Sequence, residues 1–397
     1  MRVLLIHDRP GARPGEEAHR PRADGVTAYL RDIARHLAGR GHRIVQLALE
    51  RGLEAEGDAG SDWIARPANG IRSNAAQDED ILDAIAAVGP AVVHLHGIHF
   101  TMSPRLLRTV MARWPSVLTL HDVGQFCPKG TRLRTDDRIC DRRRGVGCVL
   151  SRCCRLTAAS QVPAMAANLA MAPARIRAVG SARRILCPSP FIADLAIAHG
   201  LSRERMAVLP GYSRFDRVAA PCGQRPRARE GRLLFVGRLE REKGFDTLLA
   251  ALDLMSDQRW TLDVIGHGPL EEEARRRLGP RLHLRAPVGQ EDLADAYRAA
   301  DVAVLPYRMP ESFGMVGVEA LSQGCPVVGF PAGGAASWMR AEHGAVPVVP
   351  GNPATLARAI AEALRDPPQA RAAFPFTLEA HLDGLERTYR EARAAHV

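Results

Sequence analysis

Two successive series of short apolar segments, each alternating with helix-type segments, limit the folds open to this chain more than any other feature. In the first series, the expected strands cover residues 2–6, 43–49, 91–96, 116–121, 184–188 and 206–210. In the second series, the expected strands cover residues 232–237, 260–266, 281–286, 301–306 and 326–330. Strands that are apolar along their whole length and alternate with helices are typical of a parallel sheet covered on both faces. The sequence therefore predicts an α/β protein with two doubly wound, Rossmann-like domains.

Length also favours two domains, because the chain has 397 residues and a single core stops growing near about 250–300 residues. A segment rich in Pro, Gly and Arg, residues 214–231, separates the two series and is the expected linker. The expected organisation is an N-terminal domain over 1–213, a C-terminal domain over 232–376, and a last helix over 377–397 that packs back on the N-terminal domain. In the first domain, residues 50–69 are expected to form a loop. An insertion rich in Cys and Arg interrupts the alternation over 122–156.

Composition and charge exclude several classes of function. The chain is 46% hydrophobic and 25% charged, which is ordinary for a globular protein and fits no disordered class. The net charge is +10, but no basic run is interleaved with aromatic residues and no nucleic-acid module is present, so we expect no nucleic-acid partner. No apolar run approaches the roughly 20 residues that span a bilayer, and no signal peptide is recognisable. We therefore expect a cytoplasmic protein. Peripheral contact with a membrane surface and the oligomeric state stay open.

Two glutamates, Glu311 and Glu319, are separated by seven residues in the second series. Glu311 precedes a small turn at Phe313-Gly314, while Glu319 falls inside the helix expected over 316–323. At the N-terminus of that helix, unpaired backbone N–H groups and the macrodipole favour an anion such as a diphosphate. Both carboxylates can therefore face a polyhydroxylated, phosphorylated ligand.

A second motif, residues 235–244, lies between an expected strand and an expected helix. Gly237 permits close approach of the backbone to a ligand. The forked guanidinium of Arg238 and the compact ammonium of Lys243 are both suited to phosphate oxygens. Either cation alone is more often a solvated surface charge. Their place at a strand end before a helix, with the two glutamates downstream, favours phosphate binding.

Three landmarks, in this order and spacing, give the chain a specific resemblance. They are residues 235–244, the Ile-Gly-His-Gly-Pro stretch at 265–269, and residues 311–328. Together they resemble the family 4 glycosyltransferases, over essentially the whole chain. These are retaining enzymes of the GT-B architecture, in which two Rossmann-like domains face each other across a cleft. The resemblance implies that the N-terminal domain over 1–213 binds the acceptor and that the C-terminal domain over 232–376 binds the nucleotide-sugar donor. Some bacterial members carry a similar cysteine-rich segment after a His-Asp element.

The resemblance implies a metal-independent, retaining glycosyltransferase. It would move a hexosyl or N-acetylhexosaminyl group from a nucleoside diphosphate sugar, in the first place a UDP-sugar, to a hydroxyl of a small molecule, a glycan or a lipid-linked glycan. The nucleotide sugar is then a substrate, and no cofactor is required. No metal is expected in the chemistry, because Arg238 and Lys243 can stabilise the phosphate charge and no Asp-x-Asp pair stands at a plausible strand end.

The resemblance also assigns roles to individual residues. Arg238 and Lys243 are expected to hold the donor diphosphate and to stabilise the departing nucleotide. Glu319 is expected to bind the donor ribose, and Glu311 the transferred sugar. The base is expected over 285–288, whose residues do not choose between uracil, guanine and adenine. The full set expected to bind the donor is Gly25, Gly237, Arg238, Lys243, Gly266, Pro287, Val288, Glu311, Ser312, Phe313, Gly314, Met315, Val316 and Glu319.

His121 and Asp122 follow an expected strand and match the His-Asp element of the family. A lone histidine at a strand end is more often structural, but at this position the resemblance implies that His121 lies beside the donor sugar and positions it. It completes an expected catalytic set with Glu311, Arg238 and Lys243. Retention in this fold is usually explained by front-face attack, in which the leaving phosphate accepts the acceptor proton. His121 then need not act as a general base.

The expected acceptor site combines Asp24, Gly25 and Thr27 with His121 and Asp122. Many relatives carry paired glycines before the first helix, whereas Asp24 here replaces one of them. An acidic side chain beside a diphosphate is unfavourable unless it faces away or binds an acceptor hydroxyl or amine. A role as helix N-cap explains Asp24 equally well.

Five of the eight cysteines fall within the insertion: Cys127, Cys140, Cys148, Cys153 and Cys154. Cytosolic disulfides are uncommon, and clustered thiols in a loop-rich insertion can bind structural zinc. Their intervals do not reproduce a standard zinc-finger spacing, so structural zinc, free thiols and a disulfide all stay open. Cys187, Cys222 and Cys325 are expected to be small core or loop residues.

Two other hypotheses keep the fold and change the function. A nucleotide-sugar epimerase or a phosphorylase-like enzyme would act on the same ligand, and donor epimerised without acceptor would identify the epimerase. A non-catalytic nucleotide-sugar binding protein is suggested by Asp24. Binding without turnover, unchanged after glycine is restored at that position, would support it.

Overall fold

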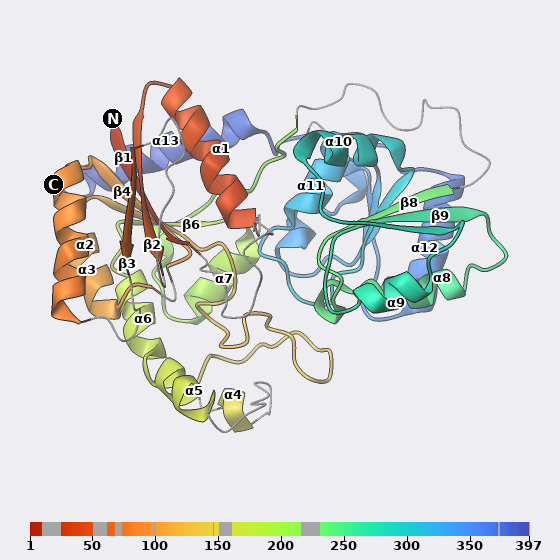
Figure 1. Ribbon diagram of the computed structural model, residues 1–397, viewed down its shortest axis with the longest axis horizontal. Helices are drawn as coiled ribbons and strands as arrows, with labels where there is room; N and C mark the ends of the chain where they lie inside the picture. The colour runs from red at the N-terminus through yellow and green to blue at the C-terminus, as the bar shows by residue number, and fades with distance from the viewer. Residues whose placement is uncertain are drawn as a thin grey trace.

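The computed structural model describes residues 1–9, 25–50, 62–67, 74–98, 101–145, 147–150, 161–215, 231–371 and 374–396. Figure 1 shows two α/β domains side by side, with α1 to α7 and the last helix, α13, on the first and α8 to α12 on the second. Within the described ranges, no helix combines the length and the apolar character needed to cross a bilayer.

The first domain is built on a seven-stranded parallel sheet in the order β3-β2-β1-β4-β5-β6-β7. Its strands are β1 (Arg2–Arg9), β2 (Arg43–Glu50), β3 (Asp62–Pro67), β4 (Val92–His96), β5 (Ser116–Thr119), β6 (Arg184–Cys187) and β7 (Met206–Val208). Its helices are α1 (Gly25–Gly39), α2 (Ala75–Val88), α3 (Pro104–Arg113), α4 (Gly147–Leu150), α5 (Gln161–Ala170), α6 (Ala172–Val179) and α7 (Pro190–Ala198). Successive residues of β1 enter different cores, Leu4 on one face and Leu5 on the other. Both faces are therefore buried, as apolar strands require.

The second domain is built on a six-stranded parallel sheet in the order β10-β9-β8-β11-β12-β13. Its strands are β8 (Gly231–Val236), β9 (Trp260–Ile265), β10 (Leu282–Arg285), β11 (Val302–Leu305), β12 (Val327–Gly329) and β13 (Ala345–Pro347). Its helices are α8 (Phe245–Asp253), α9 (Glu271–Arg276), α10 (Gln290–Ala299), α11 (Met315–Ser322) and α12 (Pro353–Arg365). The prediction of two doubly wound parallel sheets is confirmed.

Two parts of the chain differ from the sequence prediction. The expected loop 50–69 contains the edge strand β3, which pairs only with β2 among the described strands and so needs little apolar surface. The prediction also stopped at residue 330 within the second sheet and did not foresee β13 and α12. Helix α12 begins after Asn352, whose side chain accepts a hydrogen bond from the Ala354 N–H (2.9 Å).

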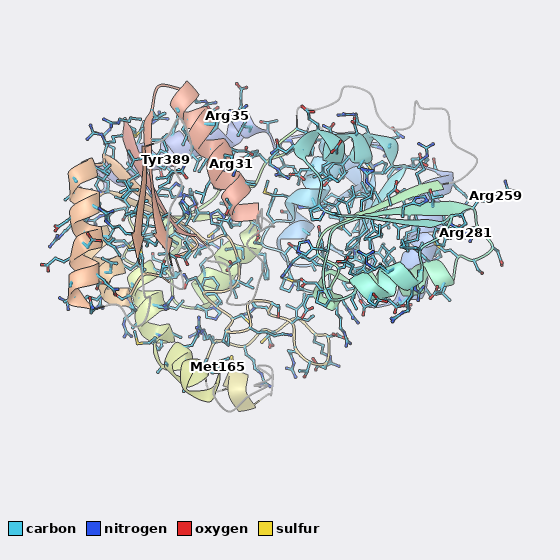
Figure 2. The ribbon with its side chains drawn as sticks, in the orientation of Figure 1. Arg31, Arg35, Met165, Arg259, Arg281 and Tyr389 are labelled. Atoms are coloured by element: carbon cyan, nitrogen blue, oxygen red, sulfur yellow. The ribbon has the colours of Figure 1, made fainter. Side chains whose placement is uncertain are left out.

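Helix α13 (Leu378–Ala394) leaves the second domain and packs on the first sheet, over β4, β5 and β6 and against α1. Leu382, Leu385 and Tyr389 on its inner face are buried in the same core as Val3 and Leu5 of β1. In Figure 2, Tyr389 lies inside the first domain, whereas Arg31 and Arg35 project from the outer side of α1. Because α13 follows α12 of the second domain, the first domain is completed by the last helix of the chain.

The crossover segment 209–215 connects the first domain with α11 of the second. The Ser213 Oγ lies 2.7 Å from the Ser322 Oγ, and the Ser213 N–H donates to the Phe376 carbonyl (2.9 Å). A further contact between the domains runs from the Ser189 Oγ, which donates to the Ser312 carbonyl (2.6 Å). The chain therefore joins the two domains directly beside the stretch 311–319.

Candidate functional site

The loop that the sequence predicts to bind the donor, residues 237–244, is called the donor loop below. It follows β8 at the carboxyl end of the second sheet, where open α/β sheets bind ligands. A short 3₁₀ turn at Arg241–Lys243 leads to Gly244, which has a φ of 75°. A Cβ atom at Gly244 would lie 1.8 Å from the Pro306 carbonyl oxygen. Glycine therefore lets this loop lie against the end of β11, and the two segments carry Lys243 and Glu311 to each other.

Lys243 and Glu311 form an ion pair that is largely buried. The Lys243 Nζ also lies 5.3 Å from the centre of the Tyr307 ring. The backbone of Glu311 is fixed by two hydrogen bonds, from its N–H to the Ala332 carbonyl (3.1 Å) and from the Gly334 N–H to its carbonyl (2.7 Å). The structure thus brings together two of the four residues expected to be catalytic.

Arg238 has different surroundings from Lys243. Its side chain is 62% exposed and pairs with Glu240 at 2.7 Å. Burial is the main cause that raises the pKa of Glu240, and the nearby Arg238 opposes this shift. Arg238 therefore extends into solvent from the loop that holds Lys243, beside a carboxylate that the sequence did not single out.

The N-terminus of α11 is built by residues far apart in sequence. Gly314 is its N-cap with a φ of 84°, and the Trp338 indole N–H donates to the Phe313 carbonyl (2.5 Å). The first N–H groups of a helix, here from Met315 and Val316, have no acceptor within the helix. Such a terminus favours an anion, and donor binding by the stretch Ser312 to Val316 stays a prediction.

Glu319 lies on α11 with only 1% of its side chain exposed. One of its oxygens accepts a hydrogen bond from the Arg214 Nε (2.6 Å), and the other from the Tyr297 hydroxyl (3.3 Å). Burial raises the pKa of Glu319, whereas Arg214 and Tyr297 lower it. The carboxylate expected to bind ribose is therefore held by protein groups here, and that role stays a prediction. Sequence reasoning missed Arg214, because nothing distinguishes it from the other arginines near the linker.

His121 follows β5 and contacts a cluster of buried rings. Its Nε2 lies 2.8 Å from Nδ1 of His96 on β4, and the Tyr29 ring on α1 packs edge-on against it at 5.2 Å. Asp122 accepts a hydrogen bond from the Gly124 N–H (2.6 Å), which starts the turn into the insertion. Sequence reasoning missed the ring partners, although two histidines spaced by two residues in a buried strand, His94 and His96, were a visible signal.

The remaining expected donor residues lie around the strand ends of the second sheet. A Cβ atom at Gly266 would lie 1.9 Å from the Gly237 carbonyl oxygen, so these two glycines let the β8 and β9 ends meet. Val288 packs on the core that includes Phe313, while Pro287 is exposed.

The expected acceptor residues are only partly described. Gly25 starts α1, where no described atom lies within 4 Å of a Cβ placed on it, and Thr27 lies in the first turn. Asp24 lies outside the described residues, so its role stays a prediction.

The cysteines of the insertion give no support for one chemistry over another. Cys127, Cys140 and Cys148 form no disulfide with one another, and the described residues hold no group of three His, Cys, Asp or Glu that could bind a metal. Cys153 and Cys154 lie outside those residues, and so does Cys222. Cys187 and Cys325 are buried in the cores, as predicted.

The insertion, part of the yellow segment in Figure 1, contacts the donor loop of the second domain through Asp137 and Arg241. Its hairpin, closed by a bridge between Leu133 and Ile139, carries Asp137 at its turn with a φ of 61°. Asp137 accepts hydrogen bonds from Arg241 (2.7 Å) and Arg308 (3.0 Å). One carboxylate of the first domain thus binds the two segments that carry Lys243 and Glu311.

Two family profiles match the sequence in succession. Residues 23–211 match the profile described as "Glycosyltransferase Family 4", and residues 230–366 match "Glycosyl transferases group 1". The D-inositol 3-phosphate glycosyltransferase of Streptomyces bingchenggensis is 34% identical over 214 residues, 48% of this chain and 47% of that protein. The one of Corynebacterium kroppenstedtii is 42% identical over 116 residues, 26% of each chain. The chain thus matches about half or less of the length of these curated relatives.

Several solved structures resemble this protein over nearly its whole length. Sucrose-phosphate synthase from Thermosynechococcus elongatus has a TM-score of 0.69 at 20% identity, with 99% of both chains covered. The Anabaena protein HepE, solved in complex with UDP and glucose, has a TM-score of 0.64 at 18% identity, covering 98% of this chain and 99% of that one. At these identities, the likeness shows the fold alone. With both domains matched in order by the two profiles, the chain belongs to the group 1 and family 4 glycosyltransferases and has the GT-B fold.

Proposed function

We propose that this protein is a retaining glycosyltransferase that moves a sugar from a nucleoside diphosphate sugar to an acceptor hydroxyl without a divalent metal. The observation that carries the proposal is the Lys243–Glu311 ion pair, held beside the N-terminus of α11 at the carboxyl end of the second sheet. A cation and unpaired N–H groups there suit a diphosphate, and a carboxylate suits sugar hydroxyls. A UDP-sugar is the first donor to test, because the similar Anabaena protein was solved with UDP and with UDP-glucose.

In this mechanism, the protein supplies positioning and fixed charge. Lys243, Arg238 and the α11 N-terminus stabilise the negative charge that develops on the leaving diphosphate, an electrostatic role that can dominate catalysis. Once Lys243 binds the diphosphate in place of Glu311, the Glu311 carboxylate is free to orient the transferred sugar. The acceptor hydroxyl attacks on the face that the diphosphate leaves, and the leaving phosphate oxygen accepts its proton. No protein base is then needed.

The acceptor belongs to the same proposal but is less narrowly defined. The curated relatives are named as D-inositol 3-phosphate glycosyltransferases, so a phosphorylated cyclitol stands first in an acceptor panel. Glycans and lipid-linked sugars follow it, since acceptor contacts lie on loops that differ between relatives.

The test is release of nucleoside diphosphate from a panel of UDP-, GDP- and ADP-sugars in excess EDTA, with the acceptor panel present and absent. We expect turnover that needs an acceptor, persists in EDTA and yields a product of unchanged anomeric configuration. Glu311→Gln should lower kcat by at least about 100-fold, while Glu273→Gln on the exposed helix α9 serves as control. An absolute requirement for manganese contradicts the proposed chemistry. Epimerised sugar without acceptor identifies an epimerase, and binding without turnover identifies a binding protein.

A further inference from the structure

The carboxyl ends of β1, β4 and β5 carry a cluster of buried histidines on the face covered by α1 and α13. His94 and His96 are two residues apart on β4, so both side chains leave the same face of the sheet. Their ring centres lie 3.9 Å apart. His7 of β1 is the parallel-strand neighbour of His96, and His121 follows the next strand. Buried polar rings destabilise a protein unless they are hydrogen-bonded, so a cluster of them suggests a functional role.

His96 contacts His121 directly and is fully buried. Its Nδ1 lies 2.8 Å from the His121 Nε2, whereas its own Nε2 is buried without a hydrogen-bond partner in the described part of the chain. A neutral imidazole has one N–H and one acceptor nitrogen. If the proton of His96 were on Nε2, a buried N–H would have no acceptor, which is rare in folded proteins. The proton therefore belongs on Nδ1, which donates to His121.

We propose that His96 is a positioning residue that holds His121 in the neutral form with its proton on Nδ1. The His121 Nε2 then accepts the hydrogen bond from His96, and the remaining proton of His121 is on Nδ1. His121 serves as a hydrogen-bond donor and not as a base. This inference rests on the proposed function, because it assigns the chemical form of a residue expected beside the donor sugar.

The described groups around His96 and His121 agree with a neutral pair. Burial lowers the pKa of His96 well below its ordinary value, and the neighbouring His94, His121, His7 and His381 lower it further. Tyr29 packs its ring against His121 from α1, and its hydroxyl donates to His381 of α13. The carboxylate nearest in sequence, Asp122, accepts a hydrogen bond from the Gly124 N–H. A proton added to the His121 Nε2 would face the N–H of His96, and would force the proton of His96 onto its unpartnered Nε2.

Nitrogen-15 NMR of the histidine side chains in the wild-type protein tests the inference without any turnover. At pH 7, the His121 signals, assigned by comparison with His121→Gln, should show a protonated Nδ1 and an unprotonated Nε2. A protonated Nε2, or an imidazolium, overturns the inference. Because this experiment needs neither donor nor acceptor, its failure is distinguishable from failure of the proposed glycosyl transfer.

Two substitutions at one position give the functional readout. In His96→Asn, the amide nitrogen can take the place of Nδ1 and donate to His121, whereas His96→Leu has no donor. We expect the Asn variant to keep the His121 tautomer and a kcat that is flat between about pH 6 and 8. In the Leu variant, kcat should fall about tenfold, as for a lost hydrogen bond, and should decrease further as the pH drops through about 6.5, the ordinary value of an imidazole.

His94→Asn controls for the general effect of altering a buried histidine, since His94 bonds Thr119 and Tyr389 and not His121. Its His121 signals should match those of the wild type. Binding of UDP to the second domain reports separately that each variant is folded. Equal pH profiles for His96→Leu and the wild type, with UDP binding intact, overturn the inference.

Discussion

The Arg214 Nε donates a 2.6 Å hydrogen bond to Oε1 of Glu319, so the segment that crosses between the domains holds the carboxylate expected to bind the donor ribose. Glu319 is nearly fully buried, and Arg214 is 19% exposed. Removing one partner of a buried pair leaves the other charge uncompensated. This pair therefore links the stability of the domain boundary to the site where the nucleotide is expected.

Arg214→Ala should destabilise the protein by about 2–3 kcal/mol, toward the lower end for a buried pair because Arg214 is partly exposed. Loss of the cation leaves burial to raise the pKa of Glu319 still further. A carboxyl group whose pKa is higher in the folded state stabilises the fold at pH values below its unfolded-state pKa. This contribution is lost as the pH rises through the folded-state pKa. The deficit relative to the wild type should therefore be smaller at pH 5 than at pH 8. Urea unfolding at both values checks this, and an equal deficit at both contradicts it.

Glu319 and Glu311 should affect different steps, although they lie on one short segment. Glu319→Gln should weaken UDP binding about tenfold or more, as expected for lost hydrogen bonds to a charged group. Glu311→Gln should leave UDP binding within about threefold and mainly lower kcat, because the pair with Lys243 lies where the sugar is expected. Calorimetric titration with UDP, set beside turnover, separates the two. Equal effects of both variants on both quantities would count against this division.

Much of the fold could be predicted because apolar strands carry their own signal. The strand expected over 91–96 is β4 at Val92–His96, and the expected terminal helix is α13. Helix α12 was predictable but missed, since its Asn352-Pro353 start and its buried Leu356 and Ile360 follow ordinary rules. The edge strand β3 gave little signal, because only one of its edges pairs within the described sheet.

The site was harder to predict, because its contacts join residues distant in sequence. The motifs singled out Lys243 and Glu311, but they did not predict that these two residues, 68 positions apart, form a pair. Nothing in the sequence indicates that Asp137 binds Arg241, 104 positions away. Such partners depend on how two domains and an insertion meet, and local patterns do not encode that geometry.

Asp137 should couple the insertion to the donor loop. Asp137→Asn removes the charge, and asparagine tolerates the left-handed backbone at this position. Asp137 is 31% exposed, and ion pairs near the surface contribute at most about 1 kcal/mol each, so KM for the donor should rise about threefold to fivefold, with kcat changed less. The difference from the wild type should shrink in high salt, which screens exposed charges.

The neighbouring substitution Asp136→Asn is the matched control for this prediction. Asp136 lies on the same turn but pairs with Arg134 of its own hairpin. Its donor KM should equal that of the wild type. A donor KM for Asp137→Asn no higher than for Asp136→Asn would show that the insertion does not act on the donor loop.

Gly317→Ala should be destabilising, although alanine normally favours a helix over glycine by about 1 kcal/mol. A Cβ atom at Gly317 would lie 1.9 Å from the Trp338 ring, whose indole also anchors the Phe313 carbonyl. Overpacking of this kind costs about 1–3 kcal/mol, and displacement of Trp338 should also weaken UDP binding. Gly39→Ala at the end of α1 has open space and should be neutral. Thermal unfolding of both variants measures the difference, and equal melting temperatures would contradict the prediction.

His381 should make the protein less stable in mild acid. Its Nδ1 donates to the Pro210 carbonyl (2.7 Å), and the Tyr29 hydroxyl donates to its Nε2 (2.9 Å), so both nitrogens are satisfied in the neutral ring. Burial lowers the pKa of His381 from 6.5 to about 4, with the bond to Pro210 opposing the shift. A basic group whose pKa is lower in the folded state stabilises the fold at pH values above its unfolded-state pKa. This contribution is lost as the pH falls through the folded-state pKa.

The stability due to His381 should therefore be fully present above pH 6.5 and lost between pH 6.5 and about 4, a total of about 3 kcal/mol. Burial lowers the pKa of His94 and His96 as well, so the wild type should show a steeper loss than one residue explains. In His381→Gln, unfolding in urea measured from pH 7.5 to 4.5 should show a pH slope smaller by about one proton. An unchanged slope would mean that His381 is already protonated in the folded protein, and that the contact between α13 and the crossover segment does not require the neutral ring.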